Sequence, residues 1–305
     1  MVLKIERVTE GCVLGEGPHW DSQNQVLYFV DILGKSLLKY NPSTSKVSKV
    51  SVAPNEPSII IPLAGKTDQF LITLNNELVV ITWDGESDTF TKNETLYSEP
   101  NGNKFNDGKC DASGRLWTGT YGTPPEDITT IPPVGTLYSL NAQRQLIPHV
   151  GEIRASNGLA FNDKTQKMYY IDTLKGAVDR FDLDVVEGKV SERKVWFTLK
   201  EHNVPGFPDG MTIDTDGNLW VAVFEGSRII KVDGSKPETL LDTIEMPARQ
   251  VTSLAFGGPN LDELYATTGT FAFGGDKPEP PVNGATYRIT GLGVKGAPAV
   301  RFKLN

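Results

Sequence analysis

A short apolar run recurs six times along this chain at nearly even spacing, and this repeat constrains the fold more than any other feature. The runs are LYFVDI (27–32), FLITL (70–74), RLWTGT (115–120), MYYIDT (168–173), LWVAVF (219–224) and LYATT (264–268). The intervals between successive runs are 44, 45, 52, 51 and 45 positions, counted at Leu27, Leu71, Leu116, Met168, Leu219 and Leu264. A period of roughly 45–50 residues is that of a four-stranded blade in a β-propeller.

The repeated unit is clearest in residues 207–232, FPDGMTIDTDGNLWVAVFEGSRIIKV. Its alternating and apolar runs are separated by turns rich in Gly and Asp, the first of them at Asp214–Gly217. Such a pattern predicts strands joined by tight hairpins. An outer strand is predicted in each of the segments KSLLKYNP, ELVVITWDG, GTLYSLN, GAVDRFDLD, SRIIKVD and ATYRITG. No segment shows a sustained helical period.

We therefore expect an all-β chain that folds as one six-bladed β-propeller over residues 1–305. A pair of β-sandwiches is the structural alternative, and the regular six-fold spacing disfavours it. The last outer strand, around Thr286–Thr290, is predicted to pair with the N-terminal run near Ile5–Val8 and so to close the ring. Two insertions rich in Pro and Gly, 120–135 and 268–284, are predicted to be loops at the rim of the central channel.

The charge balance bears on which partners this chain binds. Lys and Arg number 30 against 38 Asp and Glu, a net charge of −8, which argues against nucleic acid or an anionic membrane as the main partner. The first residues lack the apolar core of a secretory signal, and no apolar run approaches the ~20 residues of a membrane helix. We expect a cytoplasmic monomer that acts on a small molecule. Cys12 and Cys110 are expected to be reduced thiols, with a bridge between them as the alternative.

The residue before the first glycine of each repeat, or its counterpart, changes from copy to copy. We call these six positions the head residues, and they are Glu16, Ser58, Asp107, Asn157, Asp209 and Ser253. The innermost strands of a propeller line its channel, so equivalent positions from all blades converge there. Glu16, Asn157 and Asp209 offer hard oxygen donors. Such a set is suited to Ca²⁺, Mg²⁺ or Mn²⁺, whereas a zinc site of the thiolate-imidazole kind uses Cys and His ligands.

A simpler interpretation is that each acid–Gly pair merely begins a hairpin, because Asp and Asn favour turns. Several carboxylates crowded on one axis would repel one another, however, and a bound cation would remove that repulsion. The histidines have no metal-ligand spacing, and His19 is expected to be a core side chain or to pack behind the site. Trp20, Trp117 and Trp220 are expected to pack in the blades. No G-x-S-x-G, P-loop or H-E-x-x-H motif is present.

Several motifs resemble a known family. GEGPHWD, LYFVDI, FNDGK, SNGLAF, YYIDT, PDGMTID, GNLWVA and TGLGVKG are similar to motifs of the senescence-marker-protein (regucalcin), gluconolactonase and luciferin-regenerating-enzyme family. The resemblance runs from about Gly15 to Gly296. PLAG, PGFPDG and FGGPNLDELY look most similar to the insect luciferin-regenerating branch.

The resemblance implies a six-bladed propeller that holds one divalent cation, usually Ca²⁺ or Zn²⁺. By motif, the metal ligands of the family fall on Glu16, Asn157 and Asp209, and Asp209 is also the implied general base. The substrate-binding Asn of FNDGK falls on Asn106. The implied activity is metal-dependent hydrolysis of a lactone, with Lys104 beside Asn106 orienting the substrate.

Two departures from the family pattern weaken the expectation of a sugar lactone. The sugar-lactone members carry Arg where this chain has Lys104, and Lys cannot reproduce the planar fork of a guanidinium. They also place an acidic residue where this chain continues with Thr123 and Pro124. Regeneration of luciferin from a cyano-benzothiazole and D-cysteine is the activity implied by the insect branch. A calcium-binding regulator without catalysis, and a protein-binding propeller without a cation, are the alternatives.

Overall fold

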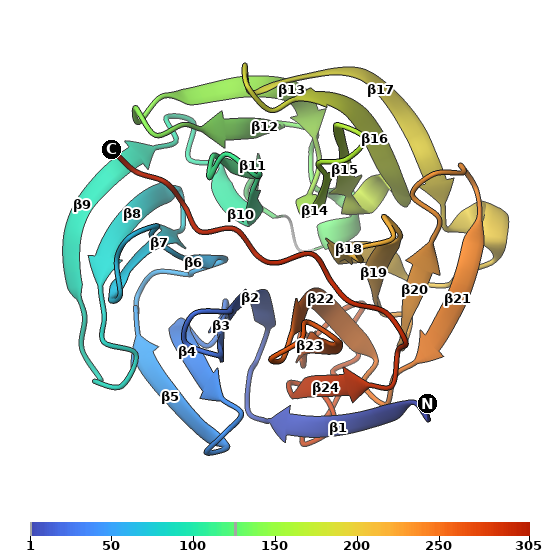
Figure 1. Cartoon of the computed structure of the whole chain (residues 1–305), viewed down its shortest axis with the longest axis horizontal. Coiled ribbons are helices and arrows are strands. Elements are labelled where there is room, and N and C mark those ends of the chain that lie inside the picture. Colours follow the sequence, from blue (N-terminus) through green and yellow to red (C-terminus); the bar gives the residue numbers. More distant parts are fainter. Residues whose placement is uncertain (1, 125–126) are drawn as a thin grey trace.

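Figure 1 shows six blades arranged in a ring around a central channel. The computed structural model describes residues 2–124 and 127–305. Each blade is a four-stranded antiparallel sheet whose strands follow one another outward from the channel. The predicted six-bladed all-β propeller is therefore confirmed, and the alternative of two sandwiches is wrong.

The inner half of each blade consists of two strands. The innermost strands, which line the channel, are β2 (Gly15–Asp21), β6 (Ile60–Pro62), β10 (Lys104–Cys110), β14 (Ser156–Asn162), β18 (Phe207–Ile213) and β22 (Gln250–Gly257). The second strands are β3 (Val26–Asp31), β7 (Gln69–Leu74), β11 (Leu116–Tyr121), β15 (Lys167–Asp172), β19 (Leu219–Phe224) and β23 (Glu263–Gly269). These second strands are the predicted apolar runs. They are almost wholly buried because neighbouring blades pack on both of their faces.

The predicted outer strands are the third strands of the blades. They are β4 (Ser36–Asn41), β8 (Glu77–Thr82), β12 (Gly135–Leu140), β16 (Ala177–Asp184), β20 (Arg228–Val232) and β24 (Thr286–Thr290). A fourth strand covers each of them, namely β5 (Lys46–Ser51), β9 (Thr91–Ser98), β13 (Leu146–Ile153), β17 (Lys189–Thr198), β21 (Leu240–Glu245) and β1 (Lys4–Thr9). Of these outermost strands only β1 was predicted, because most residues of the others face solvent and show no apolar pattern.

The ring closes where the N-terminal strand completes the last blade. β1 pairs antiparallel with β24, with Ile5 opposite Ile289 and Arg7 opposite Tyr287. An ion pair of 2.8 Å between Arg288 and Glu6 joins the same two strands. The predicted closure is confirmed, and it ties the beginning of the chain to its last strand, as Figure 1 shows.

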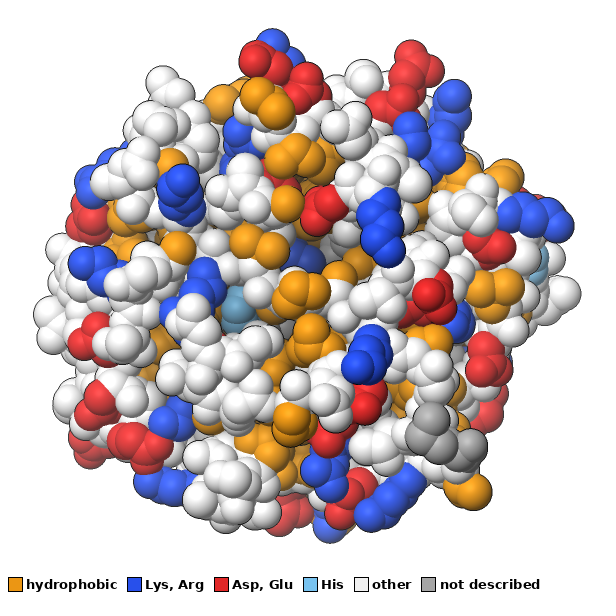
Figure 2. Space-filling view, in the orientation of Figure 1, with side chains coloured by type: hydrophobic (Ala, Val, Ile, Leu, Met, Phe, Trp, Pro, Cys, Tyr) orange, Lys and Arg blue, Asp and Glu red, His pale blue; other side chains and the backbone are white. Residues whose placement is uncertain are grey.

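The C-terminal segment, residues 296–302, crosses one end of the channel (Figure 1). It begins with a bridge from Gly296 to Asp214 in blade five and ends where Phe302 pairs with Leu63 in blade two. Arg301 donates to both carboxylate oxygens of the buried Asp21, at 2.7 and 2.8 Å. Figure 2 shows hydrophobic side chains gathered around the centre of this face. The segment therefore closes one end of the channel with its own packing.

The tryptophans and cysteines pack in the interior of the blades. Trp20, Trp117 and Trp220 are buried, as predicted. The indole N–H of Trp117 donates to Asp111 at 2.8 Å. Cys12 and Cys110 are both free and buried, so the alternative of a bridge between them is wrong.

Helical structure is confined to three 3₁₀ turns in the residues that the structure describes: η1 (Ile128–Thr130), η2 (Thr173–Lys175) and η3 (Lys200–His202). Within residues 2–124 and 127–305, no helix has the length and apolar character needed to cross a bilayer.

Candidate metal centre

The head residues lie inside or just before the innermost strands rather than at the start of hairpins. Glu16 is the second residue of β2, Asn157 the second of β14, and Asp209 the third of β18. The pairing register shifts at each of them: between Glu16 and His19 in β2, between Ser156 and Leu159 around Asn157, and between Pro208 and Met211 around Asp209. Such a bulge leaves a residue unpaired and redirects its side chain. The acid–Gly pairs therefore lie at bulges within strands and not in the turns that Asp and Asn favour.

The glycines after three of the head residues, Glu16, Asn157 and Asp209, allow two blades to approach one another. A Cβ on Gly158 would lie 2.6 Å from the carbonyl oxygen of Asp209, and one on Gly210 would lie 2.0 Å from the Ser253 hydroxyl. Real Cβ atoms do not come so close. Gly17, Gly158 and Gly210 are thus required by contact with the next head residue around the ring, whereas Gly108 faces Thr118 of its own blade.

Hydrogen bonds from side chains to backbone carbonyls join the segments that carry the head residues from one blade to the next. Ser58 donates through its hydroxyl to the carbonyl of Asn106 at 2.9 Å, and Asn106 donates through Nδ2 to the carbonyl of Ser156 at 2.7 Å. Between the last blade and the first, Thr252 donates to the carbonyl of Gly15 at 2.6 Å. All six heads are at most 8% exposed, at Glu16, Ser58, Asp107, Asn157, Asp209 and Ser253.

Three carboxyl groups share this buried space. Burial, and then the negative charge of Asp107, raise the pKa of Glu16 to about 8. Burial, and then the charges of Glu16 and Asp107, raise the pKa of Asp209 well above its usual range. Glu16 accepts the N–H of Gly17 at 2.9 Å, whereas no donor from the described part of the chain reaches the Asp209 carboxylate. The three groups resist ionisation together unless positive charge joins them.

The side-chain amide of Asn157 is hydrogen-bonded through its nitrogen but not through its oxygen within the described residues. Its Nδ2 donates to the Thr173 hydroxyl at 2.9 Å, which orients the side chain. Its Oδ1 is buried and accepts no hydrogen bond from residues 2–124 and 127–305. An unpaired buried oxygen costs about 1–3 kcal/mol, so this atom is suited to bind a cation that enters the channel.

The donor set fits a hard divalent cation. Carboxylates and amide oxygens are the ligands that Ca²⁺ and Mg²⁺ prefer. The described residues contain no cluster of three or more His, Cys, Asp or Glu side chains arranged to hold a metal. A cation here would therefore depend on the Asn157 oxygen together with Glu16 and Asp209.

Lys104 and Asn106, the predicted substrate contacts, are half-buried on β10. The Lys104 ammonium forms an ion pair of 2.7 Å with Glu56. Lys104 also lies opposite Tyr121 in the register of β10 and β11. Asn106 is anchored to blade four through Nδ2, which leaves its Oδ1 for other contacts. Glu56 and Tyr121 were not predicted, because neither belongs to the repeated motif.

Three aromatic rings pack together at the start of β18, the strand that carries Asp209. Phe207, two residues before Asp209, pairs in register with Phe224 at the end of β19. Phe273, from the insertion 268–284, packs edge-on against both, with ring centroids 5.5 Å and 5.6 Å apart. This contact brings the insertion next to the start of β18, as predicted for a rim loop.

The other insertion, 120–135, includes residues 125–126, which lie outside the described residues. Thr123 and Pro124, the departures from the family pattern, are exposed. The later half of this loop is held by Arg154, which donates to the carbonyls of Ile131 at 3.0 Å and Thr129 at 3.2 Å.

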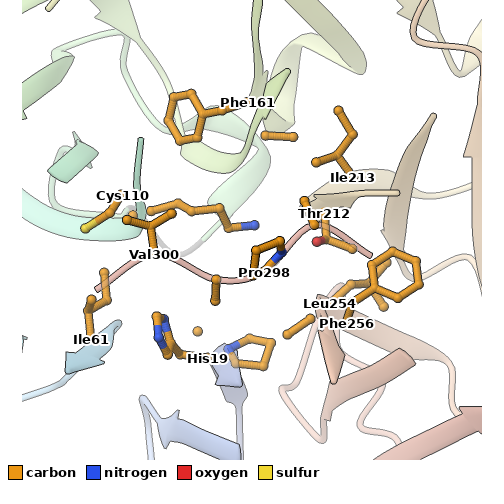
Figure 3. Close-up of a pocket in the computed structure, with 18 of the residues that line it drawn as sticks. His19, Ile61, Cys110, Phe161, Thr212, Ile213, Leu254, Phe256, Pro298 and Val300 are labelled. Atoms are coloured by element: carbon orange, nitrogen blue, oxygen red, sulfur yellow. The ribbon is translucent and has the colours of Figure 1, made fainter. Parts of the chain in front are cut away.

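A cavity of about 90 Å³ lies in the channel between the heads and the C-terminal segment. In Figure 3, His19, Thr212, Leu254, Pro298 and Val300 border it. Burial lowers the pKa of His19 to about 4, so the imidazole is neutral at pH 7. His19 is thus packed inside the channel, as predicted.

The fold and these side chains define a class: six-bladed propellers with buried carboxyl and amide groups gathered in the channel. The family model for the SMP-30/Gluconolactonase/LRE-like region matches residues 14–270, and the chain belongs to this family. Regucalcin of Xenopus laevis is 36% identical over 304 residues, with 98% of each chain covered. Regucalcin of Sus scrofa is 35% identical over 304 residues, with 97% of each covered.

Solved structures extend the comparison. A luciferin-regenerating enzyme is 44% identical with a TM-score of 0.94, covering 99% of this chain and all of its own. The calcium-binding protein regucalcin of Agrobacterium tumefaciens has a TM-score of 0.83 at 23% identity, covering 98% and 97%, and supports the fold alone. The family predicted from the motifs is confirmed, and the identity to the luciferin-regenerating enzyme agrees with the predicted branch.

Proposed function

We propose that this chain is a divalent-cation-dependent hydrolase of the gluconolactonase and regucalcin type. The observation that carries the proposal is the buried Oδ1 of Asn157, which accepts no hydrogen bond from the described residues, at the level of the channel that also holds the buried carboxyl groups of Glu16 and Asp209. A purely structural channel would give such an oxygen a donor.

Glu16, Asn157 and Asp209 would hold the cation. Ca²⁺ is the first choice because all three donors are hard oxygens, with Zn²⁺, Mn²⁺ and Mg²⁺ as alternatives. When bound, a divalent cation supplies Lewis-acid polarisation of a carbonyl and a lowered pKa for water.

The side chains of the chain supply the proton transfer and the orientation. A water oxygen attacks the acyl carbon, the acyl C–O bond of the lactone breaks, and the water proton passes through the Asp209 carboxylate to the departing alkoxide. Asn106 Oδ1 orients a substrate hydroxyl, and Lys104 does so only after exchanging Glu56 for the substrate.

The aromatic rings at the start of β18, the strand of Asp209, favour a second candidate reaction. Phe207, Phe224 and Phe273 form an apolar wall suited to a planar aromatic substrate rather than a polyol. Lys104 in place of Arg also weakens recognition of a sugar. Conversion of 2-cyano-6-hydroxybenzothiazole and D-cysteine to luciferin is therefore the specific activity we favour, as in the luciferin-regenerating enzyme that the chain resembles.

A metal-dependent activity screen tests the proposal. The full chain is treated with chelator, resupplied with each cation, and assayed on sugar lactones, aromatic esters and the cyano-benzothiazole with D-cysteine. We expect turnover that needs the cation and is lost in Asp209→Asn. Tight Ca²⁺ binding without turnover of any substrate would favour the non-catalytic calcium-binding regulator instead. Absence of cation binding would favour a protein-binding propeller.

We further propose that the protein works as a cytoplasmic monomer on a small molecule. The net charge of −8 supports the small-molecule part of this proposal, since it disfavours nucleic acid and anionic membranes as partners. Light scattering of the purified chain tests the monomer, and a mass of twice 33.4 kDa would contradict it.

A further inference from the structure

Lys109 spans the channel from blade three to blade five. It lies on β10, two residues after Asp107, and its ammonium donates to the carbonyl of Met211 on β18 at 2.5 Å. Met211 is two residues after Asp209, and blade four lies between the two blades that Lys109 joins. A long charged side chain that crosses the channel is a feature that the repeated motif does not explain.

The surroundings of Lys109 hold its charge close to the head residues. It borders the same cavity as Asp107, His19 and Thr212. Burial lowers the pKa of the Lys109 ammonium, and the negative charge of Asp107 raises it again. Burial likewise raises the pKa of Asp107, and the positive charge of Lys109 opposes that rise. Lys109 and Asp107 lie two residues apart on β10 and border one cavity without a direct ion pair between them in the described residues, so each charge stabilises the other over this short separation.

The formal charges of the three buried carboxylates and of Lys109 determine the charge of the cation that would balance them. Glu16, Asp107 and Asp209 carry three negative charges when ionised, and Lys109 carries one positive charge. The remaining charge of minus two is balanced by one divalent cation. Buried charges are stable only when they are paired, so the balance sets which cation the channel accepts.

We propose that Lys109 is a resident counter-ion for Asp107 that matches the charge of the channel to a divalent cation. The inference rests on the proposed cation site and adds a positioning residue that is not itself a ligand. Without Lys109, the channel would carry one more negative charge and would favour a trivalent ion of similar size.

Cation competition on the full chain tests this role. The probes are Ca²⁺, followed by calorimetry, and Tb³⁺, followed by its luminescence. We expect Lys109→Met to raise the ratio of Tb³⁺ to Ca²⁺ affinity by about tenfold or more. Asp107→Asn should lower the ratio, and the double variant should return it to within about threefold of the original.

Two control variants test whether the effect comes from the charge of the side chain at position 109. Lys109→Arg keeps the charge and should keep the ratio. Lys231→Met removes a half-buried lysine that pairs with Asp214 and should also leave the ratio unchanged. If Lys109→Met does not fold, the test is made with Asp107→Asn. An unchanged or increased ratio of Tb³⁺ to Ca²⁺ affinity in that variant overturns the inference.

The outcomes also separate the inference from the proposed function. An original chain that binds neither cation overturns both. An original chain that binds Ca²⁺, with an unchanged ratio in Lys109→Met, overturns the role of Lys109 alone.

Discussion

Asp209 and Asn157 have surroundings that lower the stability of the folded chain. Burial and neighbouring charges raise the pKa of the Asp209 carboxyl group, and the buried Oδ1 of Asn157 accepts no hydrogen bond from residues 2–124 and 127–305. Proteins retain such groups where function requires them. At the scale of single residues, we therefore expect substitutions at this site to raise the stability of the fold and to lower activity.

Asp209→Asn should show this conflict directly. The amide removes one of three mutually repelling carboxyl groups, so unfolding of the chelator-treated protein should cost roughly 1–3 kcal/mol more. Cation binding should be lost at the same time. Urea unfolding at pH 7.5 and calcium titration measure the two effects. Asp88→Asn, at an exposed position, is the control and should change neither; a destabilised Asp209→Asn protein would contradict the account.

The pH dependence of stability follows from Glu16. Its pKa rises from 4.5 in the unfolded chain to about 8 in the folded one, mainly through burial. Stability gained from the bound proton is complete below pH 4.5 and is lost as pH rises through 8. His19 and His149, whose pKa values burial lowers to about 4, act in the opposite direction below pH 6.5.

The window from pH 6.5 to 8 therefore isolates the carboxyl effect. In chelator, the free energy of unfolding should fall by about 1–2 kcal/mol across this window. The stabilisation by saturating Ca²⁺ should grow by a similar amount, because the cation replaces the proton. Thermal unfolding at four pH values with and without Ca²⁺ measures both, and a stabilisation that shrinks with rising pH would count against the site.

At the scale of strands, the heads are positioned by glycines that let the blades meet. Gly158→Ala would push a methyl group into the carbonyl of Asp209, where backbone leaves no room. We expect a loss of about 1–3 kcal/mol in stability and at least tenfold weaker Ca²⁺ binding. Gly151→Ala, on β13 with no atom within 4 Å, is the matched control and should be nearly neutral. Equal effects of the two substitutions would refute the proposed blade contact.

The strands also show what the sequence could and could not predict. The second strands differ from the predicted runs by no more than one residue at either end, because burial on both faces makes them continuously apolar. The outermost strands such as β9, TKNETLYS, escaped prediction because they are mainly solvent-exposed. Alternation carries information only where one face is buried.

The candidate site also contains residues that the sequence predicted and residues that it did not. The register of the repeats predicted that Glu16, Asn157 and Asp209 would share one level of the channel. Lys109 was not predicted, because its partner Met211 is 102 residues away and on a blade that is not its neighbour. Phe273 was missed for a related reason, since its insertion has no counterpart in the other blades.

At the scale of the whole molecule, two chain ends complete the ring. β1 supplies the fourth strand of the last blade, and the C-terminal segment spans from blade five to blade two. Phe302 in that segment is fully buried. Phe302→Ala should therefore lower the free energy of unfolding by about 3–5 kcal/mol.

Urea unfolding measures this loss against Val186→Ala, at an exposed position, which should be close to neutral. A loss below about 1 kcal/mol for Phe302→Ala would show that the segment merely rests on the propeller.

Calorimetric titration of Ca²⁺ into the chelator-treated full chain tests the central claim most directly. We predict saturable binding of one cation per chain, abolished in both Asp209→Asn and Asn157→Leu while the propeller stays folded. Absence of saturable binding in the original chain, or one-to-one binding that survives both substitutions, would contradict a cation site at the heads of the blades.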